Sequence, residues 1–170
     1  TRKESSAASD VYKRQAQVGI RMAELPTGTR AAIFATILVA FSIKAAVFPL
    51  DAWLPDSYPT AASIVTAVFA GLLTKVGVYA IIRMRSTVFT AGSLDNMLMW
   101  VALLTMIVGV MGAIAQNDIK RLMSFTLVSH IGYMIFGVAL GSVAGLSGAI
   151  FYAVHHILVQ TSLFLSLIHI

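Results

Sequence analysis

Two lysines stand inside apolar stretches where a charged side chain is costly. Lys44 lies about thirteen residues into a run that begins near Ala31, which at ~1.5 Å of rise per residue is close to mid-depth of a ~30 Å hydrocarbon layer. Lys75 lies about fifteen residues into the next run, which begins near Pro59. A charge at that depth costs ~2.5 to 3.5 kcal/mol, so it normally faces a protein interior or a water-filled path. Because burial disfavours the ammonium form, both lysines are candidate proton carriers.

A second interpretation, without any role in transport, stays open for these lysines. A lysine near the end of a membrane helix can extend its amine to the interface and serve no transport role. This alternative has more weight for Lys75, which lies nearer the expected end of its helix, than for Lys44.

Two prolines, Pro49 and Pro55, follow Lys44 closely. Each removes a backbone donor and obstructs the turn before it, so we expect the helix to break just beyond the lysine. A broken helix beside a buried charge is typical of secondary transporters. Asp51 and Asp56 flank the break and could pair with Lys44, although anchoring of the turn near the membrane surface fits them better.

Histidines supply further candidates for proton transfer. His130 lies in the fourth apolar run with Tyr133 on the same helical face, and it could either relay protons or hydrogen-bond across helices. His156 lies in the fifth run on a four-residue stripe with Tyr152 and Gln160. That stripe could line a file of water molecules or form an interhelical hydrogen-bond seam. His155, the residue before His156, points about 100° away from it around the helix and cannot face the same path.

Composition indicates an integral membrane protein, because 58% of the 170 residues are hydrophobic and only 11% are charged, against roughly 25% charged in soluble domains. The chain has no cysteine, which excludes disulfides, iron-sulfur ligation and thiolate zinc sites. Motifs for nucleophilic catalysis, phosphate binding, haem or clustered metal ligands are absent from the sequence, so we expect no enzyme activity, cofactor or metal. Much of the basic excess lies in the first thirty residues, so a nucleic-acid partner is not expected.

The pattern predicts an all-α, polytopic transmembrane bundle of about five spans with one broken helix. We expect residues 1–15 to be a non-native-looking or disordered tail, 16–30 a polar connection, 31–165 a fragment of a longer membrane module, and 166–170 a non-native-looking end. Glycine pairs should let the helices approach closely. The expected spans are 31–47 with a continuation at 50–57, 59–82, 96–115, 122–140 and 144–165, and the glycine pairs are Gly109 and Gly112, Gly132 and Gly137, and Gly145 and Gly148.

Orientation is only weakly indicated by charge. Lys120 and Arg121 follow Asp118, an expected helix cap, in a tight loop that favours the cytoplasmic side. Arg83 and Arg85 lie at the other end of the third span and argue for the opposite orientation.

Five short blocks of the sequence, taken in order, closely resemble the proton-translocating membrane module shared by respiratory complex I and Mrp-type multisubunit cation/proton antiporters. Within that family the second span looks most like the D subunit of Mrp (Mnh) antiporters. The blocks are Ile43-Lys44-Ala45-Ala46-Val47-Phe48-Pro49-Leu50, Trp53-Leu54-Pro55-Asp56, Leu73-Thr74-Lys75-Val76-Gly77-Val78-Tyr79, Asn117-Asp118-Ile119-Lys120-Arg121-Leu122 and Ser129-His130-Ile131-Gly132-Tyr133.

The resemblance implies roles for individual residues. Lys44 would be the lysine beside the first broken helix and Lys75 the bridging lysine of the next helix. His130 and His156 would lie on a central polar axis, and the turn at Asp118 would face the cytoplasm. Gln160 departs from the family, because relatives often carry lysine there. The family's glutamate partner of the broken-helix lysine lies on an earlier helix that this sequence does not contain, so the fragment should not transport alone.

Three hypotheses follow. The first is a subunit of a monovalent cation (Na⁺)/proton antiporter in a bacterial cell membrane, with other subunits, protons, cations and the lipid bilayer as partners. The second is a proton-pumping membrane subunit of an NADH:quinone oxidoreductase. The third is a structural membrane bundle whose lysines pair internally.

Overall fold

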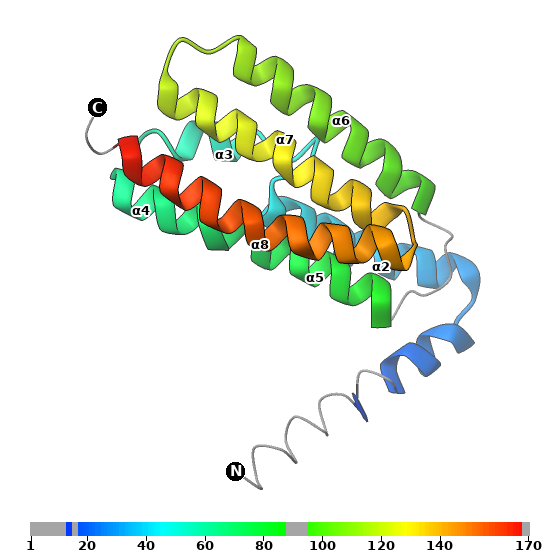
Figure 1. The fold of residues 1–170 in the computed structure, drawn as a ribbon. Coiled ribbons are helices and arrows are strands. Elements are labelled where there is room, and N and C mark those ends of the chain that lie inside the picture. The colour runs from blue at the N-terminus through cyan, green and yellow to red at the C-terminus, as the bar shows by residue number, and fades with distance from the viewer. Residues whose placement is uncertain (1–12, 15–16, 88–94, 168–170) are drawn as a thin grey trace, which may run out of the picture.

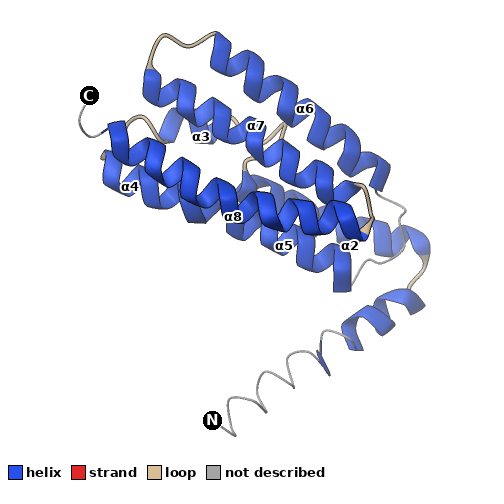
Figure 2. Ribbon diagram, in the orientation of Figure 1, coloured by secondary structure: helices blue, strands red, loops and turns tan. Residues whose placement is uncertain are grey.

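The computed structural model describes residues 13–14, 17–87 and 95–167 (Figure 1), and every regular element within these residues is helical (Figure 2). The main helices are α2 (Thr27–Ala45), α3 (Trp53–Ser57), α4 (Ser63–Val68), α5 (Thr74–Thr87), α6 (Asp95–Ile114), α7 (Ile119–Ala139) and α8 (Val143–Ser166), and the π-helical segment η1 (Phe69–Leu73) joins α4 to α5. Five stretches of this part of the chain are long and apolar enough to cross a membrane.

The long helices lie side by side as a bundle (Figure 1). Helix α6 packs on α7, α7 packs on α8, and α8 covers α4 and η1, while α2 lies against α5. The core between them is formed mainly by small and branched apolar side chains. The expected all-α membrane bundle with one broken helix is therefore confirmed, and the chain is a multi-pass membrane protein.

Glycines set the closest helix contacts, as expected. A Cβ atom at Gly109 would overlap the backbone nitrogen of Ser129, so α6 and α7 touch through their backbones. Gly137 and Gly145 play the same part between α7 and α8, where each would meet the other's carbonyl oxygen. Gly148 is different, because a Cβ atom there would meet nothing within 4 Å.

Several helix boundaries differ from the sequence expectation, and α4 begins at Ser63 where a start at Pro59 was expected. Helix α2 begins at Thr27, so part of the expected polar connection is helical, and residues 17–24 are helical as well. Helix α5 continues to Thr87, past the two arginines expected to end it. The expected tail and the expected end of the chain fall largely outside the described residues, as does most of the loop after Thr87.

Helix α2 ends before either proline. Ala46 adopts a left-handed conformation with φ 57°, its N–H bonds to the Ile43 carbonyl at 3.2 Å, and the Val47 N–H bonds to the Ser42 carbonyl at 3.0 Å. This pair of bonds is a Schellman motif, which normally places glycine where Ala46 stands. The helix therefore breaks just beyond Lys44, as expected, although the chain has left the helix three residues before Pro49.

Pro55 does not break a helix. It lies in the first turn of α3, where its missing N–H has no intrahelical acceptor to lose. The break is therefore a loop between Ala45 and Trp53 that contains Pro49, with a cis peptide bond between Phe48 and Pro49.

Candidate functional site

Lys75 is buried in the middle of the bundle. It lies midway between Ser63 and Thr87, the ends of the combined α4, η1 and α5 helix, and only 6% of it is exposed. Its Nζ atom donates a hydrogen bond of 2.6 Å to the Ala70 carbonyl, which belongs to the π-helical segment. Because the amine bonds within the helix interior, Lys75 does not extend to a membrane interface, and the snorkelling alternative is wrong for this conformation.

The π-helical segment ends at Leu73, two residues before Lys75, and was not predicted from the sequence. Within it, Gly71 faces α8 so closely that a Cβ atom there would overlap the Thr161 hydroxyl oxygen. A π turn inserts one residue into a helix and weakens the regular i to i−4 pattern, which leaves carbonyl groups available for other donors. The Ala70 carbonyl, which belongs to this segment, is the acceptor for the Lys75 amine.

His130 and His156 meet between α7 and α8. Their ring centroids are 4.7 Å apart, and His130 Nδ1 shares a short hydrogen bond with the Tyr152 hydroxyl. His156 is 2% exposed, and neither of its ring nitrogens has a hydrogen-bond partner among the described residues. His155 is exposed, and its ring centroid lies 6.2 Å from that of Tyr152.

Lys75, His130 and His156 form one buried layer, by which we mean that each lies near the middle of its own helix. His130 and His156 lie near the middle of α7 and α8, as Lys75 does on its own helix. The structure thus gathers three of the four predicted proton-translocation residues at one depth, on three different helices.

The supporting polar residues divide. Tyr152 lies against both histidines, with ring centroids 5.9 Å from His130 and 6.2 Å from His156. Tyr133 is half exposed and touches the edge of this cluster, its ring centroid 6.1 Å from that of Tyr152. Gln160 is buried and donates from Nε2 to the Met123 carbonyl at 3.2 Å, so it forms part of a hydrogen-bond seam between α8 and α7.

Lys44 stands apart from this cluster. It lies in the last turn of α2 and is exposed on the described part of the chain. Its neighbour Ala45 is buried against Gly77, where a Cβ atom would lie 2.7 Å from the Ala45 nitrogen. Ala45 follows Lys44 by one residue and Gly77 follows Lys75 by two. The contact between Ala45 and Gly77 therefore brings the helical turns that carry the two lysines to a similar depth.

The acidic residues of the break do not pair with Lys44. Asp56 forms an ion pair with Arg121 at 2.9 Å, which links α3 to the start of α7. Asp51 is buried in the loop of the break. Asp118 caps α7 as predicted, its carboxylate accepting from the Lys120 N–H at 3.0 Å.

Two further side chains hold the break and were missed from the sequence. Thr105 of α6 accepts a hydrogen bond from the Phe48 N–H at 3.1 Å, and Trp53 Nε1 donates to the Ile43 carbonyl at 2.9 Å. The Thr105 bond joins positions 57 residues apart, so local sequence carries no signal for it. A tryptophan shortly after a helix end is a weak signal that could have suggested the second bond.

Comparison with known proteins places this geometry in a family. Residues 16–170 match the family described as NADH:quinone oxidoreductase/Mrp antiporter, TM. The chain is 40% identical over 153 residues to the D subunit of a Na(+)/H(+) antiporter from Alkalihalophilus pseudofirmus, covering 88% of this chain and 31% of that protein. It is 36% identical over 141 residues to the protein of the same name from Bacillus subtilis, covering 82% of this chain and 29% of the relative.

A solved structure agrees with these relatives. The chain superposes on a chain of the Mrp complex from Dietzia sp. DQ12-45-1b with a TM-score of 0.84 and 36% identity, covering 90% of this chain and 28% of that one. The present chain thus spans about a third of the length of the relatives it matches. It belongs to the family of membrane subunits shared by NADH:quinone oxidoreductases and Mrp antiporters.

Proposed function

We propose that this chain is the proton-translocating part of a subunit of a multisubunit Na⁺/H⁺ antiporter in a bacterial cell membrane. The observation that carries the proposal is the buried layer of Lys75, His130 and His156, three titratable groups on three helices at one depth. Burying ionisable side chains in a membrane protein is energetically costly, and such residues normally mark a route for protons or ions. The names of the relatives, which are Na(+)/H(+) antiporter subunits, support sodium as the exchanged cation.

In this proposal protons move along the layer by changes in the protonation of neighbouring groups. The amine of Lys75 exchanges a proton with the imidazole pair, and the Tyr152 hydroxyl holds the orientation of His130. Lys44 supplies protons to the layer from its place in the last turn of α2, at the end of the broken helix. The remaining length of the protein and the other subunits of the complex provide the cation pathway and the rest of the proton route.

A redox-driven proton pump is the alternative function within the same family, since the family description covers NADH:quinone oxidoreductases. The antiporter is preferred because the relatives compared above carry antiporter names. Both functions make the protein a carrier of protons, and neither assigns covalent chemistry to this chain.

The test uses the complete protein assembled with its partner subunits in everted membrane vesicles. A pH gradient is preset, sodium is added, and the sodium-induced dissipation of the gradient is compared between wild type and Lys44→Ala. We expect the sodium response to be lost in Lys44→Ala at unchanged abundance of the complex. Lys120→Ala, which removes a lysine from the start of α7, is the matched control and should respond like wild type.

Two kinds of result would count against the proposal. Near-normal transport by a well-assembled Lys44→Ala complex would remove Lys44 from the route. A wild-type complex without any response to sodium would favour another cation or the redox-driven function, and a loss of abundance in Lys44→Ala would favour the structural role.

A further inference from the structure

The break after α2 creates a demand for hydrogen-bond acceptors inside the membrane. Backbone N–H groups that leave a helix within the hydrocarbon layer have no water to bond, so the protein must satisfy them. The Phe48 N–H is such a group, because it follows the Schellman motif and precedes Pro49. Its acceptor is the hydroxyl oxygen of Thr105, at 3.1 Å.

Thr105 is arranged to accept this bond. It lies in the middle of α6, and its side chain is fully buried at 0% exposure. Its own hydroxyl proton is donated to the Val101 carbonyl at 2.6 Å, one turn earlier in the same helix. With the proton directed there, the oxygen lone pairs remain for the Phe48 N–H.

The two side-chain bonds at the break differ in what they connect. Trp53 donates to the Ile43 carbonyl, so that bond joins the two halves of the broken helix to each other. The Thr105 bond joins the break to α6, and one turn further along α6 the backbone of Gly109 touches Ser129. Ser129 directly precedes His130, so α6 connects the break to the histidine helix through two close contacts.

We propose that Thr105 is a positioning residue, which holds the end of α2 and therefore Lys44 at a fixed place relative to the layer of Lys75, His130 and His156. It acts through the Phe48 backbone and touches none of the proton-carrying groups named above. The inference rests on the proposed function of Lys44, but the hydrogen bond itself can be tested independently of transport.

The first experiment measures amide hydrogen exchange of the Phe48 to Leu50 segment in the complete, assembled complex. Thr105→Val keeps the shape of the side chain and removes the acceptor, so we expect the Phe48 amide, left without a partner, to exchange at least ~10-fold faster. Thr105→Ser keeps the hydroxyl and should exchange like wild type. Thr36→Val is the matched control, because the Thr36 hydroxyl donates to the Ala32 carbonyl at 2.9 Å in the same i to i−4 manner.

The second experiment measures the pH profile of sodium-induced gradient dissipation in the same variants. We expect Thr105→Val to lower the maximal rate several-fold and to move the pH of half-maximal activity, with Thr105→Ser restoring both. A purely structural role would lower abundance and leave the pH profile of the assembled fraction unchanged. If Thr105→Val does not assemble, Thr105→Ala is measured with the same two readouts.

The outcomes separate the two proposals. Unchanged exchange at Phe48 in Thr105→Val, or faster exchange with a wild-type pH profile, would overturn the positioning role. The positioning role is supported if Thr105→Val shows both faster exchange at Phe48 and a shifted pH profile, while Thr105→Ser and Thr36→Val show neither. A wild-type complex that shows no sodium response would refute the antiport proposal, while the exchange experiment would still report whether Thr105 holds the break.

Discussion

At the scale of single residues, the three groups of the buried layer are held in different ways. Lys75 donates to a carbonyl of its own helix, and His130 bonds to a hydroxyl on the next helix. His156 has no hydrogen-bond partner on either ring nitrogen within the part of the chain that the structure describes. An imidazole in that situation keeps both a donor and an acceptor for groups that approach it. In the proposed proton route, His156 is therefore the member of the layer that we expect to pass a proton onward.

The chemistry of Lys75 can be separated from its charge. Lys75→Arg keeps a cation but introduces a planar guanidinium that does not release its proton in proteins. We expect Lys75→Arg to lose most of the sodium-induced gradient dissipation, as Lys75→Met should, with both complexes assembled. Full activity of Lys75→Arg in the everted-vesicle assay would mean that Lys75 contributes only its charge.

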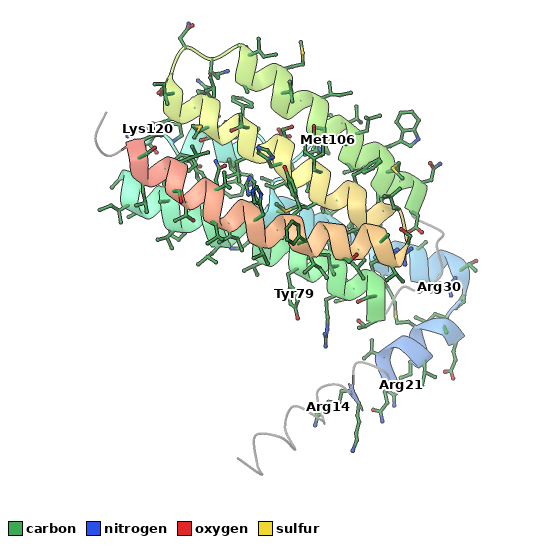
Figure 3. All side chains as sticks on the ribbon, in the orientation of Figure 1. Arg14, Arg21, Arg30, Tyr79, Met106 and Lys120 are labelled. Carbon is green, nitrogen blue, oxygen red and sulfur yellow. The ribbon has the colours of Figure 1, made fainter. Side chains whose placement is uncertain are left out.

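The Tyr152 hydroxyl should matter through His130. Tyr152→Phe removes the group that shares a hydrogen bond with His130 Nδ1 and keeps the aromatic ring. We expect a several-fold lower transport rate at normal abundance. Tyr79→Phe is the control, because Tyr79 is 60% exposed and points away from the bundle (Figure 3). Equal rates for the two variants would contradict the role given to Tyr152.

At the scale of elements, hydropathy patterns sufficed to predict the five spans, and the prolines that follow Lys44 predicted the broken helix. Those features depend on local composition, and so does the Asp118 cap, which the structure confirms. The π-helical segment, the left-handed Ala46 and the Thr105 bond were not predicted, because each depends on contacts with other helices. Lys75 lies farther from the end of its helix than expected, because Arg83 and Arg85 suggested an end for a helix that continues to Thr87.

Helix α2 is held against α5 at one glycine, and that contact can be measured. A Cβ atom at Gly77 would lie 2.7 Å from the backbone nitrogen of Ala45, so Gly77→Ala must push the two helices apart. Overpacking of this kind costs about 1 to 3 kcal/mol, and we expect a lower melting temperature for the solubilised complex. Gly148→Ala is the control, because a Cβ atom there meets no other atom within 4 Å. Alanine also favours a helix over glycine by roughly 0.5 to 1 kcal/mol. A Gly77→Ala complex as stable as wild type would contradict the close contact.

At the scale of the whole molecule, the two ends of the bundle differ in how their charges are held. At one end Asp56 and Arg121 form an exposed pair beside the Asp118 cap. At the other end Arg85 forms a two-pronged ion pair with Asp95, at 2.7 and 2.5 Å. Lys120 lies near the C-terminal end of α8 (Figure 3), so the turn between α6 and α7 and the end of α8 share one side of the membrane.

The orientation of the bundle can be determined by labelling, because this chain contains no cysteine. Asn117 is exposed in the turn between α6 and α7, and Val143 is 87% exposed at the start of α8. With a membrane-impermeant maleimide, we expect Asn117→Cys to react in everted vesicles and Val143→Cys to react in intact cells. The reverse pattern would place Lys120 and Arg121 outside and would overturn the expected orientation.

The extra residue of the π turn also has a consequence for insertions and deletions. Loss of one residue from a regular membrane helix rotates every following side chain by about 100°. Loss of one residue from Phe69–Leu73 should instead convert the π turn to an α-turn, so that the residues beyond it keep their faces. Lys75 would then stay within the bundle, but the carbonyl that accepts from its amine would return to the regular ladder of the helix. We expect a protein shortened there to insert and assemble with an amine that is no longer tethered, so this segment is the one place in the helix where chain length can vary without a change of register.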